Sequence, residues 1–230
     1  MPTRNHLIDL LRASAIVMMV LFHFIFDLSF FGYVALSIPN GEGWREFRAL
    51  IVSLFLITMG ASLVLANPGQ IQWHKLFKRS ALLLIGAVMT TAVSLLVTPS
   101  EWIYFGILHF ILLASWLCLG LRQRPTLALV LAVSLVLLYN AQLLPSNWPF
   151  SLWSALLPEI TADFVAPVPW LAAVLFGMYL AHQRWFLQPY WLTLKVPGWM
   201  QWASQQSLWI YLLHQPLFFA GFYLFRASAA

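Results

Sequence analysis

Residues 7–31, LIDLLRASAIVMMVLFHFIFDLSFF, form the first long apolar stretch of the chain. A helix of roughly 20 apolar residues crosses the hydrocarbon of a bilayer, so this stretch is long enough to span it. It also contains Asp9 and Arg12, which the short apolar core of a cleavable signal peptide would not tolerate. The stretch therefore predicts a retained transmembrane helix.

The rest of the chain repeats this pattern. Hydrophobic residues make up 62% of the sequence and charged residues 8%, against roughly 25% charged in an ordinary soluble domain. We therefore expect an all-α fold, a polytopic transmembrane bundle of about seven helices, or eight, forming one domain over residues 1–230. The further apolar stretches are 48–66, 79–98, 102–121, 126–144, 166–183 and 207–226, separated by breaks such as Pro39-Asn40-Gly41 and Asn67-Pro68-Gly69. Segment 145–165 is interpreted as either interfacial or re-entrant.

The basic residues predict the orientation. Short cytoplasmic loops carry an excess of Lys and Arg, and a cytoplasmic amino terminus places most of these residues inside. The inside connections would then hold Arg4, Lys75, Lys78, Arg79, Arg122, Arg124, Arg184 and Lys195, and the outside ones Arg45, Arg48 and Arg226. We therefore expect a cytoplasmic amino terminus.

Other functional classes are excluded by what the sequence contains. The net charge is +5, but no basic run with interleaved aromatic residues suggests binding to nucleic acid. Cys118 is the sole cysteine, which rules out an internal disulfide and a cysteine metal cluster. No local pair of histidines has metal-ligand spacing, so we expect no metal.

The first helix carries a polar stripe. At about 100° per residue, Asp9, Arg12, His23 and Asp27 fall within an arc of roughly 60°. Ionisable groups inside a membrane are costly and mark functional sites, so the stripe must face protein or a water-filled cleft. Asp9 and Arg12 form either a structural ion pair or an entrance for an anionic ligand. Asp27 lies one turn from His23 and is expected to orient it as a general base.

Two other apolar stretches carry histidines at a similar depth, His109 and His214. Each alone could be a hydrogen-bonded core residue. Together with His23 they predict one buried polar site. Lys78 and Arg79, at the start of the third stretch, are either positive-inside anchors or a phosphate-binding pair.

Several motifs together resemble one known family. They are Arg4-Asn5-His6-Leu7-Ile8-Asp9-Leu10-Leu11-Arg12-Ala13, the run from Met19 to Leu28 around His23, Phe105-Gly106-Ile107-Leu108-His109-Phe110, Pro167-Val168-Pro169-Trp170 and Ser207-Leu208-Trp209-Ile210-Tyr211-Leu212-Leu213-His214-Gln215-Pro216. In this order they resemble the bacterial branch of the heparan-α-glucosaminide N-acetyltransferase family. The resemblance covers nearly the whole chain.

The resemblance implies a multi-pass acyltransferase of the bacterial inner membrane. It would take an acyl group, expected to be acetyl, from cytoplasmic acyl-CoA to an amino or hydroxyl group of an envelope saccharide. Asp9, Arg12, Lys78 and Arg79 would bind CoA, and Tyr211 and Trp170 would bind substrate. His23 would act as general base or carry the acyl group covalently, with Asp27, His109 and His214 completing the catalytic site. The partners would be lipid, acyl-CoA and the saccharide, and a homo-oligomer is left open.

One departure from the family pattern concerns the catalytic histidine. In the lysosomal relatives it follows the first helix, whereas here no histidine occurs between His23 and His74. The main alternative function is a small-solute transporter or a proton-coupled channel that uses the same stripe. Only the acyltransferase would consume a thioester.

Overall fold

A computed structural model describes residues 5–38, 41–145, 147–159, 161, 163–184 and 186–228. Three residues named in the sequence analysis lie outside this range. They are Arg4, counted among the inside cations, and Pro39 and Asn40, which belong to the break after the first apolar stretch. The described residues are helical or irregular and contain no strand, which confirms the all-α class. The chain forms two compact units, residues 1–55 with 188–230, and residues 56–187. The expectation of a single domain stays a prediction.

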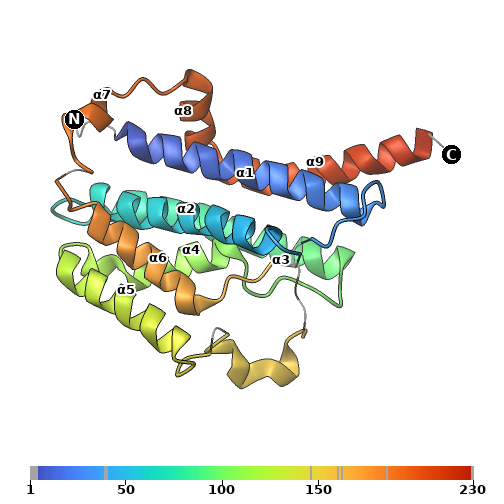
Figure 1. Ribbon diagram of the computed structural model, residues 1–230, viewed down its shortest axis with the longest axis horizontal. Coiled ribbons are helices and arrows are strands. Elements are labelled where there is room, and N and C mark those ends of the chain that lie inside the picture. The colour runs from blue at the N-terminus through green and yellow to red at the C-terminus, as the bar shows by residue number, and fades with distance from the viewer. Residues whose placement is uncertain are drawn as a thin grey trace. The chain divides into compact units, whose positions relative to one another are not determined.

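The first unit is built around the amino-terminal helix. Asn5 caps α1 (His6–Phe30), because its side-chain oxygen accepts the backbone N–H of Leu7 at 3.0 Å. Both α8 (Gly198–Gln205) and α9 (Ser207–Ser228) pack along α1, as Figure 1 shows. The short α7 (Pro189–Thr193) also contacts it. The start of α2 (Trp44–Leu65) supplies Ile51 to a core with Met19 and Phe22.

The second unit holds the end of α2 and the helices that follow. α3 (Trp73–Val97) packs against α4 (Ile107–Leu117), and α5 (Pro125–Asn140) lies along α6 (Pro167–Leu180). Two 3₁₀ turns complete it, η1 (Leu119–Leu121) and η2 (Phe150–Leu156). Phe150 of η2 contacts Phe105, with 4.6 Å between the ring centroids. Both interpretations of segment 145–165, interfacial and re-entrant, stay predictions.

Two glycines let α2 and α6 approach each other within the second unit. A Cβ atom on Gly60 would lie 2.0 Å from the carbonyl oxygen of Val174, and one on Gly177 would lie 2.1 Å from that of Ile57. Small residues of this kind allow close backbone packing between membrane helices. The crossing therefore has room for hydrogen at both positions and for no side chain.

Four helices in the described part of the chain are long and apolar enough to cross a membrane: His6–Phe30, Trp44–Leu65, Trp73–Val97 and Ser207–Arg226. Three shorter apolar helices, α4, α5 and α6, have 11, 16 and 14 residues. Seven helices thus correspond to the seven apolar stretches, while seven crossings and the cytoplasmic amino terminus stay predictions. The stretch 102–121 yields a helix only from Ile107, because residues 98–106 are irregular.

Candidate functional site

The polar stripe of α1 is turned away from the exposed surface. Asp27 is 0% exposed and Asp9 is 5% exposed, while Arg12 and His23 are half-buried. This matches the arc derived from the helical period. The four side chains separate into two places, one near each end of α1.

At the far end of the stripe, two histidines from distant parts of the sequence meet. The rings of His23 on α1 and His214 on α9 lie with their centroids 4.9 Å apart and their planes tilted by 58°. Tyr211, one turn earlier on α9, lies 6.0 Å from the His214 ring between centroids. The positive charge of Arg48, a half-buried residue of α2 in the same unit, also acts on His23. Of the three histidines expected to form one site, His23, His109 and His214, the structure brings His23 and His214 together within the first unit, and the shared site stays a prediction.

The surroundings of His214 fix its tautomer. Its Nδ1 lies 2.8 Å from the carbonyl oxygen of Tyr211 and 3.1 Å from that of Ile210. Carbonyl oxygens can only accept, so the neutral ring must carry its proton on Nδ1 and a lone pair on Nε2. His214 is 8% exposed, and its Nε2 has no hydrogen-bond partner among the described residues. His214 therefore has a buried imidazole nitrogen whose lone pair accepts no hydrogen bond from the described residues.

Asp27 has a different partner from the one that the sequence suggested. Its Oδ1 accepts a hydrogen bond of 2.8 Å from Nε2 of Gln215, the residue after His214. Neither ring nitrogen of His23 makes a hydrogen bond within the described part of the chain. The carboxylate therefore joins α1 to α9 beside the histidine pair. The sequence analysis quoted Gln215 within a motif but gave it no role, since a lone Gln carries no strong signal.

This region has unfilled hydrogen-bonding capacity. Three buried atoms have no partner among the described residues: Asp27 Oδ2, Gln215 Oε1 and His214 Nε2. Each is an acceptor in the arrangement above. An unsatisfied buried polar group costs about 1–3 kcal/mol, and native structures keep few of them. Each of the three atoms can therefore accept a hydrogen bond from a ligand.

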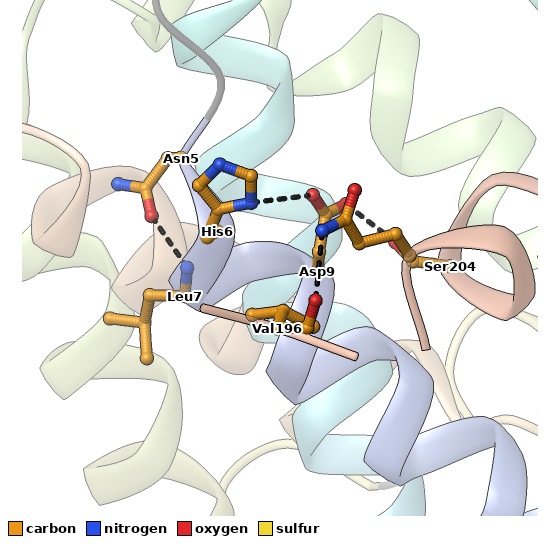
Figure 2. Close-up of polar contacts among 7 residues, drawn as sticks. Asn5, His6, Leu7, Asp9, Val196 and Ser204 are labelled. Atoms are coloured by element: carbon orange, nitrogen blue, oxygen red, sulfur yellow. Dashed lines mark hydrogen bonds and ion pairs between the residues drawn. The ribbon is translucent and has the colours of Figure 1, made fainter. Parts of the chain in front are cut away.

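At the other end of the stripe, Asp9 holds α8 against α1. Figure 2 shows the Asp9 carboxylate between His6 and Ser204. Ser204 donates to Asp9 Oδ1 at 2.9 Å, and His6 Nδ1 lies 3.9 Å from Asp9 Oδ2. In the same region Gln201 donates to the carbonyl oxygen of Val196 at 2.9 Å. Neither His6 nor Ser204 was expected here, because α8 falls in what the sequence presents as a connection.

Replacing Ser204 with Ala should loosen α8. The change removes the Ser204 hydroxyl from a buried carboxylate, at a cost of about 1–3 kcal/mol. We expect trypsin to cleave after Lys195, just before α8, about tenfold faster in the native fold. The matched control is Thr193→Val, which removes an exposed hydroxyl in the same segment. Equal cleavage of Ser204→Ala and the unmodified chain would show that this bond does not hold α8.

His109 lies in the second unit, in a fully bonded setting. The backbone N–H of Gly106 donates to its Nδ1 at 3.3 Å, which places the proton on Nε2. That nitrogen lies 3.3 Å from the hydroxyl of Thr91, which in turn donates to the carbonyl of Ile103. Asp163 accepts the next backbone N–H, that of Ile107. His109 thus caps the amino terminus of α4, and a catalytic role for it stays a prediction.

The remaining predicted site residues are spread over both units. Lys78 is exposed and Arg79 half-buried in the second turn of α3, and Trp170 is half-buried in the first turn of α6. Their proposed binding roles, like that of Arg12, stay predictions. Within the described residues no three His, Cys, Asp or Glu side chains are grouped so as to hold a metal ion.

The polar stripe and the histidine pair belong to motifs that extend over most of the chain. A known protein family matches the chain over a similar range. The family described as heparan-alpha-glucosaminide N-acetyltransferase, catalytic, matches residues 4–216. The chain belongs to this family. The resemblance to this family, read from the sequence, is thereby confirmed, while its bacterial branch stays a prediction. No curated protein and no solved structure matches the chain.

Membership and the apolar helices together make this a membrane protein of an acetyltransferase family. The matched range contains Asp9, His23, Asp27, His109 and His214. It ends at Pro216, just after the His214-Gln215 pair, so it contains all of α1 and the first ten residues of α9, from Ser207 to Pro216. The family match gives no role to any of these residues, so the roles proposed for them rest on their geometry.

Proposed function

We propose that this protein transfers an acetyl group from acetyl-CoA to an amino or hydroxyl group of a saccharide, with the histidine pair of α1 and α9 as its catalytic centre. The observation that carries the proposal is the buried, vacant Nε2 of His214 beside the His23 ring. A general base needs a lone pair directed to the substrate and a tautomer held in place. His214 has both.

The reaction runs through attack on the thioester. The acceptor nitrogen or oxygen bonds to the thioester carbon while its proton passes to Nε2 of His214. The carbon–sulfur bond then breaks, CoA leaves as a thiolate, and the histidinium returns the proton to the sulfur. Tyr211 is the residue proposed to stabilise the developing oxyanion. His23 lines the same centre and is the alternative base, or the acyl carrier.

The unfilled acceptors favour an amine over a hydroxyl as the accepting group. An ammonium group brings three N–H donors and a hydroxyl brings one. Asp27 Oδ2, Gln215 Oε1 and His214 Nε2 supply three acceptors. The family's description names a glucosaminide, whose amino group has this chemistry. A bound ammonium would give up one proton to the Asp27 carboxylate before it attacks, and the second proton would pass through Nε2 of His214 to the sulfur of CoA.

The donor would meet the other polar residues of the predicted site. Arg12, Lys78 and Arg79 are proposed to bind CoA at the cytoplasmic side, as cations suit its phosphates, and Asp9 belongs to the same proposed entrance. Because Asp9 also holds Ser204, its part would be to shape this entrance rather than to touch CoA. Trp170 is proposed as a substrate contact and His109 as a catalytic or positioning residue. The membrane would be the bacterial inner membrane.

The competing function is transport of a small solute or of protons along the same polar stripe. It predicts flux without chemistry. The first test uses the full-length protein in lipid nanodiscs with acetyl-CoA and methyl glucosaminide. We expect release of free CoA thiol, with the N-acetylated sugar formed in equal amount and detected by mass spectrometry.

Arg12→Ala is the companion variant for donor binding. It should raise the KM for acetyl-CoA about tenfold, through loss of one charge-assisted contact, and should leave the KM for the sugar unchanged. The opposite result has two parts: no acetyl-CoA is consumed with either an amino sugar or a hydroxyl sugar, and protons or solute cross proteoliposomes that contain the protein. This result would show that the protein is a transporter and not an acetyltransferase.

A further inference from the structure

An apolar groove lies beside the histidine pair, between α1 and α9. Its volume is about 370 Å³, and its lining includes Phe24, Leu28, Phe218, Gly221 and Phe222. All of them belong to the first unit. The groove has aromatic walls and almost no polar surface, so it suits a hydrocarbon chain.

The groove adjoins the candidate catalytic centre through Phe218, one of its wall residues. Phe218 packs on the His214 ring, with 6.1 Å between centroids, and on Phe24, with 5.5 Å. Phe24 directly follows His23 in α1. The vacant acceptors Asp27 Oδ2, Gln215 Oε1 and His214 Nε2 lie on the same two helices. One end of this region therefore calls for hydrogen-bond donors and the other for an apolar chain.

The transferred group is too small to explain the groove. An acetyl group has two carbons and would leave most of 370 Å³ empty. The acceptor is the reactant that could bring a longer apolar chain to the groove. A molecule with an amino sugar at one end and a hydrocarbon chain at the other matches both parts.

We propose that the acceptor is a lipid-linked amino sugar, whose sugar amine meets the His23–His214 pair while the first part of its hydrocarbon chain lies in the groove of Phe24, Phe218 and Gly221. This inference rests on the proposed acetyl transfer and adds the class of acceptor. It separates this chain's substrate from a free polysaccharide, which has no apolar chain to place there.

Gly221 offers a direct test. A Cβ atom at this position would meet nothing within 4 Å, so Gly221→Leu fills the groove without a clash with the backbone. The matched control is Ala220→Leu, at an exposed position outside the lining. Both variants place a leucine on α9 and differ in whether it lies in the groove.

The experiment compares methyl and hexyl glucosaminide as acceptors, below the micelle concentration of the longer one, in nanodiscs with acetyl-CoA. Each methylene buried in the groove contributes about fourfold in affinity. We expect hexyl glucosaminide to have the lower KM, Gly221→Leu to raise that KM about tenfold by displacing roughly two methylenes, and methyl glucosaminide to keep its KM. Ala220→Leu should change neither.

A second arm replaces acetyl-CoA by octanoyl-CoA with methyl glucosaminide as acceptor. Should Gly221→Leu impair octanoyl-CoA and spare hexyl glucosaminide, the groove holds the donor chain and the inference is overturned. Transfer to both glucosaminides at equal KM in all three proteins would also overturn it, while leaving the acetyltransferase intact. Absence of transfer to either sugar by the unmodified protein would instead refute the proposed function, and this inference with it.

Discussion

Replacing His214 with Asn is expected to lower kcat for acetyl transfer about 10²- to 10⁴-fold, the usual contribution of a general base. The amide of Asn can still donate to the backbone carbonyl of Ile210, as Nδ1 of the histidine does. It has no atom at the place of Nε2, the nitrogen with the vacant lone pair. The variant thus removes the base and keeps the local hydrogen bond, so binding of acetyl-CoA should be unchanged.

The control for this variant is His182→Asn. His182 also places Nδ1 near the carbonyl oxygen four residues earlier, that of Met178, at 3.0 Å. It lies beyond the end of α6, in the second unit. Its replacement should leave kcat within twofold. An unaltered kcat in His214→Asn would remove His214 from the mechanism, and His23→Asn would then be the variant to measure for loss of turnover.

Adding one methyl group at Gly60 is expected to have the largest effect on stability. In Gly60→Ala the new Cβ would lie 2.0 Å from the carbonyl oxygen of Val174 and 2.9 Å from its carbon. Both neighbours are backbone atoms, so the clash is relieved only if α2 and α6 move apart. Overpacking of a core costs about 1–3 kcal/mol and sometimes more, and we expect a value of about 3 kcal/mol or above.

The measurement is the fraction of folded protein that survives heating in detergent, read by size-exclusion chromatography. Gly177→Ala should behave like Gly60→Ala, because its Cβ would lie 2.1 Å from the carbonyl oxygen of Ile57. Gly221→Ala is the control, since it also changes a helical glycine but meets nothing within 4 Å. A Gly60→Ala protein as heat-resistant as the control would mean that the two helices do not cross this closely.

Much of the site could be predicted from α1 alone. The period of the helix places Asp9, Arg12, His23 and Asp27 on one face, and none of the four is exposed in the structure. The cost of charge in a membrane predicts that such a face is covered. The partner that covers each residue could not be predicted in this way. Asp27 was expected to orient His23, and it binds Gln215 instead, 188 residues away.

The positions of the helices along the chain could likewise be predicted from the sequence, whereas their contacts with distant parts of the chain could not. The apolar stretches determined where the four long helices and the three shorter apolar helices run, because a helix that meets lipid must be apolar along its own length. They gave no sign of α8, whose Ser204 is 195 residues from Asp9, because a short helix docked on a neighbour needs no long apolar run.

The sequence by itself determined that this is a membrane protein of the acetyltransferase family, with a polar stripe on its first helix and a histidine in each of two further apolar stretches. Only the tertiary structure paired His23 with His214 and capped α4 with His109. The physical reason is that periodicity fixes which face of a helix is polar, whereas packing between helices decides which side chain meets it.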